Sequence, residues 1–348
     1  MPRTPIPSSA AALLACAVAA CSVQEPPPST GTPVASGNSS RAAAPASATP
    51  SARTSARSGV AEAWEHLPDA PFARLEMAVT AHDGRVWLAG GLSALGEALI
   101  DVDIFDPASG AWSEGPSLPA PVHHAALVST GDELLLVGGY QGSDFNRPTD
   151  LVLVLADGDA AWREGAPLPE ARAAGTAAWD GSRVVYAGGV GPEGVSADVY
   201  ALVGDAWERI GSMAQTREHL AATSDGDGAV WLLGGRVGSL TTNLDVVELV
   251  SGSSITSIGS LPTARGGVAA FHAPGLGACL TGGEAPEFAF TTVECIDADG
   301  TIVTLPELNE PHHGHGAAVV NGIAFVVLGG PEPSLSAGAT VESLALGH

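Results

Sequence analysis

Arginine and histidine residues recur along the chain at similar points, each after a Leu-Pro or comparable turn. They are Arg74, His123, His124, Arg172, Arg217, His219, Arg265, His312, His313 and His315. Arginine presents a fixed fork of donors that suits carboxylates. A ring of these side chains would therefore bind a carboxylate, a sugar acid or an acidic peptide. The structural alternative is that each arginine donates hydrogen bonds to carbonyl groups of a neighbouring strand, and both interpretations remain open at this point.

The histidines also raise the question of a metal. Imidazole suits zinc, copper and nickel, and His312, His313 and His315 lie near one another in sequence. The spacing matches no motif as specific as His-Glu-x-x-His, and histidine takes the place that arginine fills in other repeats. The chain also lacks a Gly-x-Ser-x-Gly elbow, a Cys-x-x-Cys pair and a phosphate-binding glycine loop. We therefore predict no metal, no cofactor and no catalytic residues.

Two further features concern loops and cysteines. Tyr140, Asp144 and Arg147 belong to a long loop that mixes aromatic and charged groups, and Arg236 falls in an equivalent loop; such loops on a rigid scaffold often carry recognition. Cys279 and Cys295 would lie opposite each other in an antiparallel pair centred near residue 287. A disulfide and two buried thiols are both compatible with that arrangement.

A repeated sequence pattern predicts the strands that position these residues. A Gly-Gly pair closes an apolar, strand-like run six times, and successive pairs are 46 to 50 residues apart. The pairs begin at Gly90, Gly138, Gly188, Gly234, Gly282 and Gly329. A period of about 50 residues with four strands per repeat predicts propeller blades. The fold class is therefore all-β, a six-bladed propeller with four antiparallel strands per blade.

The ends of the repeat region indicate how the ring closes. The last repeat stops at its third strand, whereas residues 63 to 68, around Trp64, match a fourth strand. We therefore predict that this N-terminal strand completes the C-terminal blade. Such closure removes the free edges that an open sheet would expose.

The Gly-Gly pairs, together with Trp112, Trp162 and Trp207 downstream of the first three, resemble kelch repeats. The resemblance covers residues 61 to 348 and implies a kelch-type propeller of the galactose-oxidase-like superfamily. The oxidases need a copper held by two tyrosines and two histidines, with a cysteine joined to one tyrosine. The three tyrosines here, Tyr140, Tyr186 and Tyr200, do not fit that arrangement. The enzymatic alternative is a resemblance to the kelch-type sialic acid mutarotases.

The amino terminus has the pattern of an export signal. Residues 1 to 21 combine a basic start, an apolar run too short to span a bilayer and small residues before a cysteine. Val18 to Cys21 resembles a bacterial lipobox, which implies lipidation of Cys21; Cys16 is a weaker alternative. Residues 22 to 59 are rich in Pro, Ser and Ala, as expected of a disordered tether. The propeller then occupies residues 60 to 348.

The net charge of the chain limits the kinds of partner that it can bind. All 14 basic residues are arginine, and 38 acidic residues give the 348-residue chain a formal net charge of -24. Such a body repels nucleic acid and anionic membrane surfaces, so membrane contact is expected only through the lipid anchor. We predict a monomeric, extracytoplasmic lipoprotein of the bacterial envelope that acts as a non-catalytic module binding an envelope protein or glycan.

Overall fold

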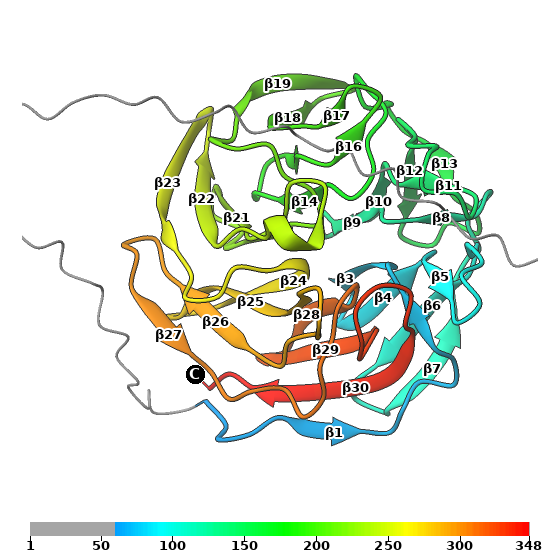
Figure 1. Ribbon diagram of the computed structural model, residues 1–348. Coiled ribbons are helices and arrows are strands. Elements are labelled where there is room, and N and C mark those ends of the chain that lie inside the picture. The colour runs from blue at the N-terminus through cyan, green and yellow to red at the C-terminus, as the bar shows by residue number, and fades with distance from the viewer. Residues whose placement is uncertain (1–59, 348) are drawn as a thin grey trace, which may run out of the picture. The chain divides into compact units, whose positions relative to one another are not determined.

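The computed structural model describes residues 60–347, in which six antiparallel sheets of four or more strands are arranged around a centre (Figure 1), and two short two-stranded sheets lie in the connections. The predicted signal peptide with Cys21 and the predicted tether lie outside the described residues. No helix long and apolar enough to cross a membrane occurs within residues 60–347. The predicted all-β, six-bladed architecture is confirmed.

The strands of each blade are given from the innermost to the outermost. Blade 1 contains β3 (Ala78–His82), β4 (Arg85–Ala89), β6 (Val102–Asp106) and β7 (Ala111–Glu114). Blade 2 contains β9 (Ala126–Ser129), β10 (Glu133–Val137), β12 (Val152–Ala156) and β13 (Arg163–Glu164). Blade 3 contains β14 (Thr176–Trp179), β15 (Val184–Ala187), β18 (Asp198–Val203) and β19 (Ala206–Ser212).

The second half of the ring repeats this order. Blade 4 contains β20 (Ala221–Ser224), β21 (Ala229–Leu233), β22 (Val246–Ser251) and β23 (Ser254–Ser260). Blade 5 contains β24 (Gly266–Ala273), β25 (Gly277–Glu284), β26 (Val293–Ile296) and β27 (Ile302–Thr304). Blade 6 contains β28 (Gly316–Val320), β29 (Ile323–Gly329), β30 (Gly338–Ala345) and β1 (Glu65–Leu67).

Short elements lie in the connections. They are β2 (Arg74–Leu75), β5 (Leu92–Ser93), β8 (Val122–His123), β11 (Tyr140–Gln141), β16 (Val190–Gly191), β17 (Gly194–Val195) and the 3-10 helix η1 (Leu240–Thr242). Because the strands of a blade alternate in direction, the connections from second to third strand and from blade to blade share one face. We call this the loop face.

The ring closes as predicted. Strand β1 pairs antiparallel with β30, with Glu65 opposite Ser343 and Leu67 opposite Val341. Figure 1 shows β1, in blue, running beside β30, in red. The N-terminal strand thus becomes the fourth strand of blade 6.

The Gly-Gly pairs let neighbouring blades approach. Gly90 has a φ of 62°, and a Cβ atom there would lie 2.3 Å from the carbonyl oxygen of Val122. The amide of Gly91 donates to that same oxygen at 2.8 Å. A side chain at Gly90 would therefore push blade 2 away from blade 1.

Cys279 and Cys295 meet as the predicted register requires. They are directly opposite in the β25–β26 pair and are fully buried. The structure joins them by a disulfide. Of the two alternatives left open by the sequence, the bonded form is the one seen.

Candidate functional site

Six backbone hydrogen bonds form a closed ring around the central axis at the loop face. One residue per blade takes part: Glu76, His124, Ala174, His219, Gly267 and Gly314. Each amide donates to the carbonyl oxygen of the preceding member, and Glu76 closes the circle on Gly314, with distances of 2.7 to 3.0 Å. All six residues have positive φ, between 51° and 67°. For the four that are not glycine this conformation is unfavourable, and such strain tends to gather at functional sites.

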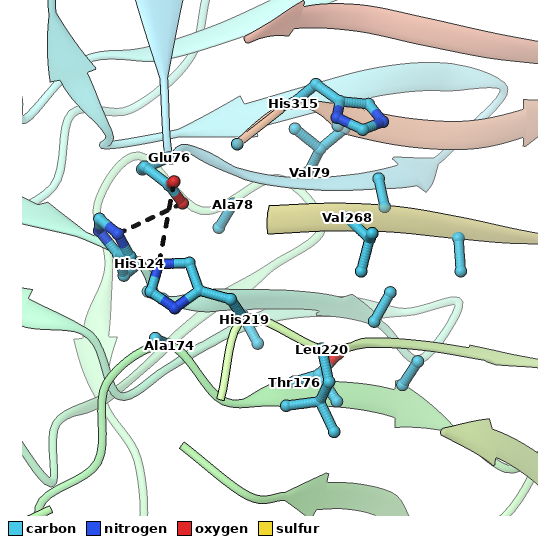
Figure 2. Close-up of a pocket in the computed structure, with 18 of the residues that line it drawn as sticks. Glu76, Ala78, Val79, His124, Ala174, Thr176, His219, Leu220, Val268 and His315 are labelled. Atoms are coloured by element: carbon cyan, nitrogen blue, oxygen red, sulfur yellow. Dashed lines mark ion pairs between the residues drawn. The ribbon is translucent and has the colours of Figure 1, made fainter. Parts of the chain in front are cut away.

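The ring surrounds the mouth of a cavity of about 140 Å³ lined by the innermost strands. Three ring members carry polar side chains, Glu76, His124 and His219, which we call the mouth cluster. Figure 2 shows the Glu76 carboxylate facing both imidazoles, while His315 lies apart on the other side of the pocket. The small members Ala174, Gly267 and Gly314 leave the rest of the ring open.

The mouth cluster is compact. His124 Nε2 lies 3.4 Å from one oxygen of Glu76, and His219 Nε2 lies 4.0 Å from the other. One potential ligand atom from each of the three side chains falls within 4.8 Å of the other two. Two imidazoles and a carboxylate are a donor set that divalent transition metals accept.

A second layer of polar groups holds the two imidazoles. His219 Nδ1 contacts the Glu218 carboxylate, and His124 Nδ1 lies 2.5 Å from His123 Nδ1. Arg236 donates from Nε to Glu218 at 3.0 Å and from a terminal nitrogen to Glu284 at 2.7 Å. Nδ1 of each histidine therefore faces a neighbouring polar side chain, and Nε2 faces the Glu76 carboxylate.

Burial sets the protonation of the cluster. Removal from water lowers the pKa of His124 to about 3, with Arg236 adding to the effect. It also lowers the pKa of His219 well below the usual 6.5 and raises that of Glu76. Both imidazoles are therefore uncharged at neutral pH, which leaves a lone pair on each ring.

The structure separates the predicted arginines from the predicted histidines. Arg74 contacts Asp103 at 2.6 Å, Arg217 contacts Glu248 at 2.7 Å and Arg265 contacts Glu294 at 3.3 Å. Arg172 bonds Glu170 and Ser196. All four are nearly fully buried, and none lines the central cavity.

One repeat is aligned differently from the sequence expectation. In the first five Gly-Gly pairs, the amide of the second glycine donates to the backbone carbonyl oxygen of the residue at the arginine position of the next blade, and for Gly91 that residue is Val122 rather than His123. Val122 shares an apolar cluster with Leu153, which stands where other blades have the partner carboxylate. The placement of His123 at the arginine position is therefore a one-residue error. His312 does occupy that position, and its Nε2 lies 3.2 Å from Glu342.

The remaining predicted residues fall around the mouth. His313 Nε2 lies 2.7 Å from the carbonyl oxygen of Ser334, and His315 Nε2 lies 2.8 Å from the Thr281 hydroxyl. Tyr140 is buried, with its ring centroid 5.3 Å from that of His123. Asp144 and Arg147 are exposed in the loop beyond it. A ligand-binding role for these residues stays a prediction.

Sequence reasoning missed Glu76, and it placed Glu218 and Glu284 on the arginine and histidine face without counting them among the candidate binding residues. Glu76 lies two residues after Arg74, just as His219 lies two residues after Arg217. An alignment of the repeats would therefore have placed Glu76 at the same position as His219. Glu218 immediately precedes His219. Only the fold shows that the Glu76 carboxylate meets the histidines of two other repeats.

Comparisons with known proteins agree with this architecture. Residues 73–119 match the Kelch motif family model. The chain is 26% identical to Kelch-like protein 41b of Danio rerio over 175 residues, covering 49% of this chain and 28% of the relative. It is 26% identical to Alpha-scruin of Limulus polyphemus over 225 residues, covering 61% and 24%. Kelch-like protein terF of Aspergillus terreus is 24% identical over 300 residues, covering 77% and 64%.

The matched regions span about a quarter of the length of the first two relatives. Among solved structures, "Structure of YjhT" superposes with a TM-score of 0.67 at 13% identity, covering 79% of this chain and 95% of that one. This likeness concerns the fold. Together with the six Gly-Gly repeats and the closed ring of blades, the matches identify the chain as a kelch-repeat β-propeller.

Proposed function

We propose that the chain is a non-catalytic binding module whose loop face docks a protein partner. The observation that carries the proposal is the distribution of exposed apolar side chains. Within residues 60–347, six of the seven large exposed hydrophobic residues lie in connections between second and third strands. They are Leu95, Ile100, Phe145, Val237, Phe288 and Leu335.

These side chains come from blades 1, 2, 4, 5 and 6 and surround the polar mouth. Leu335 is 63% exposed and Phe288 is 51% exposed. Apolar groups gathered on one face favour a protein partner, because their burial on association is stabilising. Phe145 is also held in place by His123, at a centroid distance of 4.8 Å. A preordered contact residue loses less entropy on binding.

A sugar-acid ligand has less support. The predicted anion site depended on arginines that reach the mouth. Arg217 instead donates to Glu248 and to the Gly234 carbonyl oxygen inside its blade. Arg265 donates to the carbonyl oxygen of Leu280 and lies 3.3 Å from Glu294. We therefore favour a protein over an acidic glycan, and a binding role over the mutarotase alternative.

We also propose that the module is monomeric and extracytoplasmic, and is tethered to the envelope membrane by lipid on Cys21. The support is the lipobox pattern of residues 18 to 21 and the Pro-rich, Ser-rich segment that follows it. A lipid anchor on a spacer would leave the loop face free to meet another envelope protein.

Photocrosslinking tests the docking face. A benzophenone side chain is placed at Phe145, Phe288 or Leu335 in the full chain and irradiated in intact cells. Val203 is the matched control, since it is 46% exposed but is the last residue of β18, where the connection to β19 lies on the opposite face.

We expect one discrete protein adduct from the three loop-face positions and none from position 203. The adduct from position 288 should disappear when Leu335→Asp is introduced. Equal adducts from both faces, or none from the loop face, would contradict the proposal.

A further inference from the structure

We propose that the mouth cluster is a binding site for one divalent first-row transition metal ion, held by Glu76, His124 and His219. This goes beyond docking of a partner, because it assigns a ligand to the axis of the propeller rather than to its loops. The three donors come from blades 1, 2 and 4, so no spacing within one repeat reveals them.

The backbone ring explains why these three side chains converge. Its members occupy equivalent positions around the axis, and their left-handed conformation is fixed by the six hydrogen bonds. Side chains at equivalent positions of a ring point to a common centre. Rigid positioning of this kind is what a metal site requires.

The donor atoms are presented in the correct orientation. Both histidines direct Nε2 toward the Glu76 carboxylate, while Nδ1 of His219 meets Glu218 and Nδ1 of His124 meets His123. A metal-ligating histidine usually donates its other N–H to a carboxylate or similar group, which fixes the tautomer. The Glu218 carboxylate lies against Nδ1 of His219, the place that such a partner takes.

The dimensions fit after a contraction of the cluster. Ligand atoms at zinc distances of roughly 2.0 to 2.2 Å lie about 3.3 Å apart in a tetrahedral site. His124 Nε2 already lies 3.4 Å from one oxygen of Glu76, His219 Nε2 lies 4.0 Å from the other, and one ligand atom from each of the three residues falls within 4.8 Å of the others. Completing the site would bring these atoms together by up to about 1.5 Å.

Charge and space favour a cation with open coordination positions. Around the mouth, Glu76, Glu218 and Glu284 carry three carboxylates against the guanidinium of Arg236. Gly314 makes room for the Glu76 side chain, because a Cβ there would lie 2.6 Å from its carboxylate oxygen. With Ala174 and Gly267 also small, one side of the ion would face the open mouth. Two imidazoles, one carboxylate and open positions are typical of zinc and non-haem iron sites.

The test measures metal binding by the full-length chain after treatment with a chelator. Zn²⁺ stoichiometry is determined by equilibrium dialysis and elemental analysis, and Co²⁺ serves as a spectroscopic probe. We expect about one Zn²⁺ per chain, and a saturable Co²⁺ absorption band that Zn²⁺ abolishes.

Glu76→Gln and the double variant His124→Asn/His219→Asn should each weaken Zn²⁺ affinity at least tenfold. Asparagine is chosen because it tolerates the left-handed conformation of the ring. Glu218→Gln, which alters only the orienting layer, should weaken affinity by about 10 to 100-fold. His66→Asn removes an exposed histidine on β1 and should change nothing.

Each outcome decides the matter. Absence of stoichiometric Zn²⁺ and of a saturable Co²⁺ band in the wild type overturns the proposal without any variant. Binding that survives in folded Glu76→Gln and in the double variant overturns it as well. Melting curves without metal establish which variants are folded.

Discussion

The indole Nε1 of Trp64 donates a hydrogen bond of 3.0 Å to the carbonyl oxygen of Pro306, 242 residues further along the chain. Trp162 makes the same bond to Pro116 at 2.7 Å, and Trp207 makes it to Ala166 at 2.9 Å. In each case a tryptophan near the outermost strand of one blade reaches the connection that leaves the preceding blade. Trp64 thus supplies to blade 6 the tryptophan that the sixth repeat lacks.

Closure by β1 should control the stability of the whole ring. Trp64 is 3% exposed and packs in the cluster between blades 5 and 6, so Trp64→Ala should cost about 3–5 kcal/mol of unfolding free energy. Deleting residues 60–70 should lower the melting temperature cooperatively for the entire propeller. The control deletion of residues 22–55 should leave melting unchanged in calorimetry. Equal melting of the two deletions would show that the ring does not depend on β1.

Arg217 and Glu248 form a buried ion pair with almost no exposure, and blade 2 replaces such a pair with Val122 and Leu153. Arg217→Val should cost about 3–5 kcal/mol in chemical denaturation, because it leaves the Glu248 carboxylate buried without its partner.

The double variant Arg217→Val/Glu248→Leu copies blade 2 and should recover part of that loss, with a coupling of about 1–3 kcal/mol. Recovery would be incomplete because Arg217 also donates to the carbonyl oxygens of Gly234 and Val246. Strict additivity of the two substitutions would mean that the pair is not the source of the effect.

The repeat made the fold predictable. A Gly-Gly pair and a strand-like run recur six times, and the unpaired segment around Trp64 matches the strand that the last repeat lacks. The functional site was harder to predict because it belongs to no single repeat. Glu76, His124 and His219 meet only after six blades close into a circle.

The misplacement of His123 has a physical cause. The arginine position is defined by a backbone carbonyl that accepts from the preceding Gly-Gly pair, and that carbonyl belongs to Val122 in blade 2. A search for basic residues cannot locate this position in blade 2, because the apolar pair Val122 and Leu153 has replaced the ion pair there. The arginines were visible in the sequence, but their carboxylate partners Asp103, Glu248 and Glu294 lie on third strands about 30 residues away.

The N-terminal prediction is independent of the propeller. Replacing Cys21 with Ala should release the protein from membranes, whereas Cys16→Ala should not, because the lipobox pattern is complete only at residue 21. Membrane fractionation with a labelled fatty acid checks both variants. A wild-type protein that takes up no label would contradict lipidation.

Acid should weaken the closure of blade 6 through Glu342. Burial by itself would raise the pKa of this fully buried carboxyl, but hydrogen bonds from His312 and from the amides of Asn309 and Glu310 outweigh it and hold the pKa below its usual 4.5. Because the pKa of Glu342 is lower in the folded chain than in the unfolded chain, where it is 4.5, the ionised carboxylate stabilises the folded state above pH 4.5. That stabilisation is lost as the pH falls through the folded-state pKa.

The carboxylate also accepts a hydrogen bond from the Asn309 side chain, which in turn donates to the carbonyl oxygen of Trp64. Glu342→Gln should therefore be less stable than the wild type at neutral pH. The difference should shrink as the pH falls below 4.5 and through the lower folded pKa, because the carboxyl of the unfolded chain takes up its proton first and that of the folded chain becomes neutral only at the lower pH. Urea denaturation of both proteins across this range measures the difference. A stability gap that stays constant from neutral to acid pH would show that the charge on Glu342 does not hold the last blade to β1.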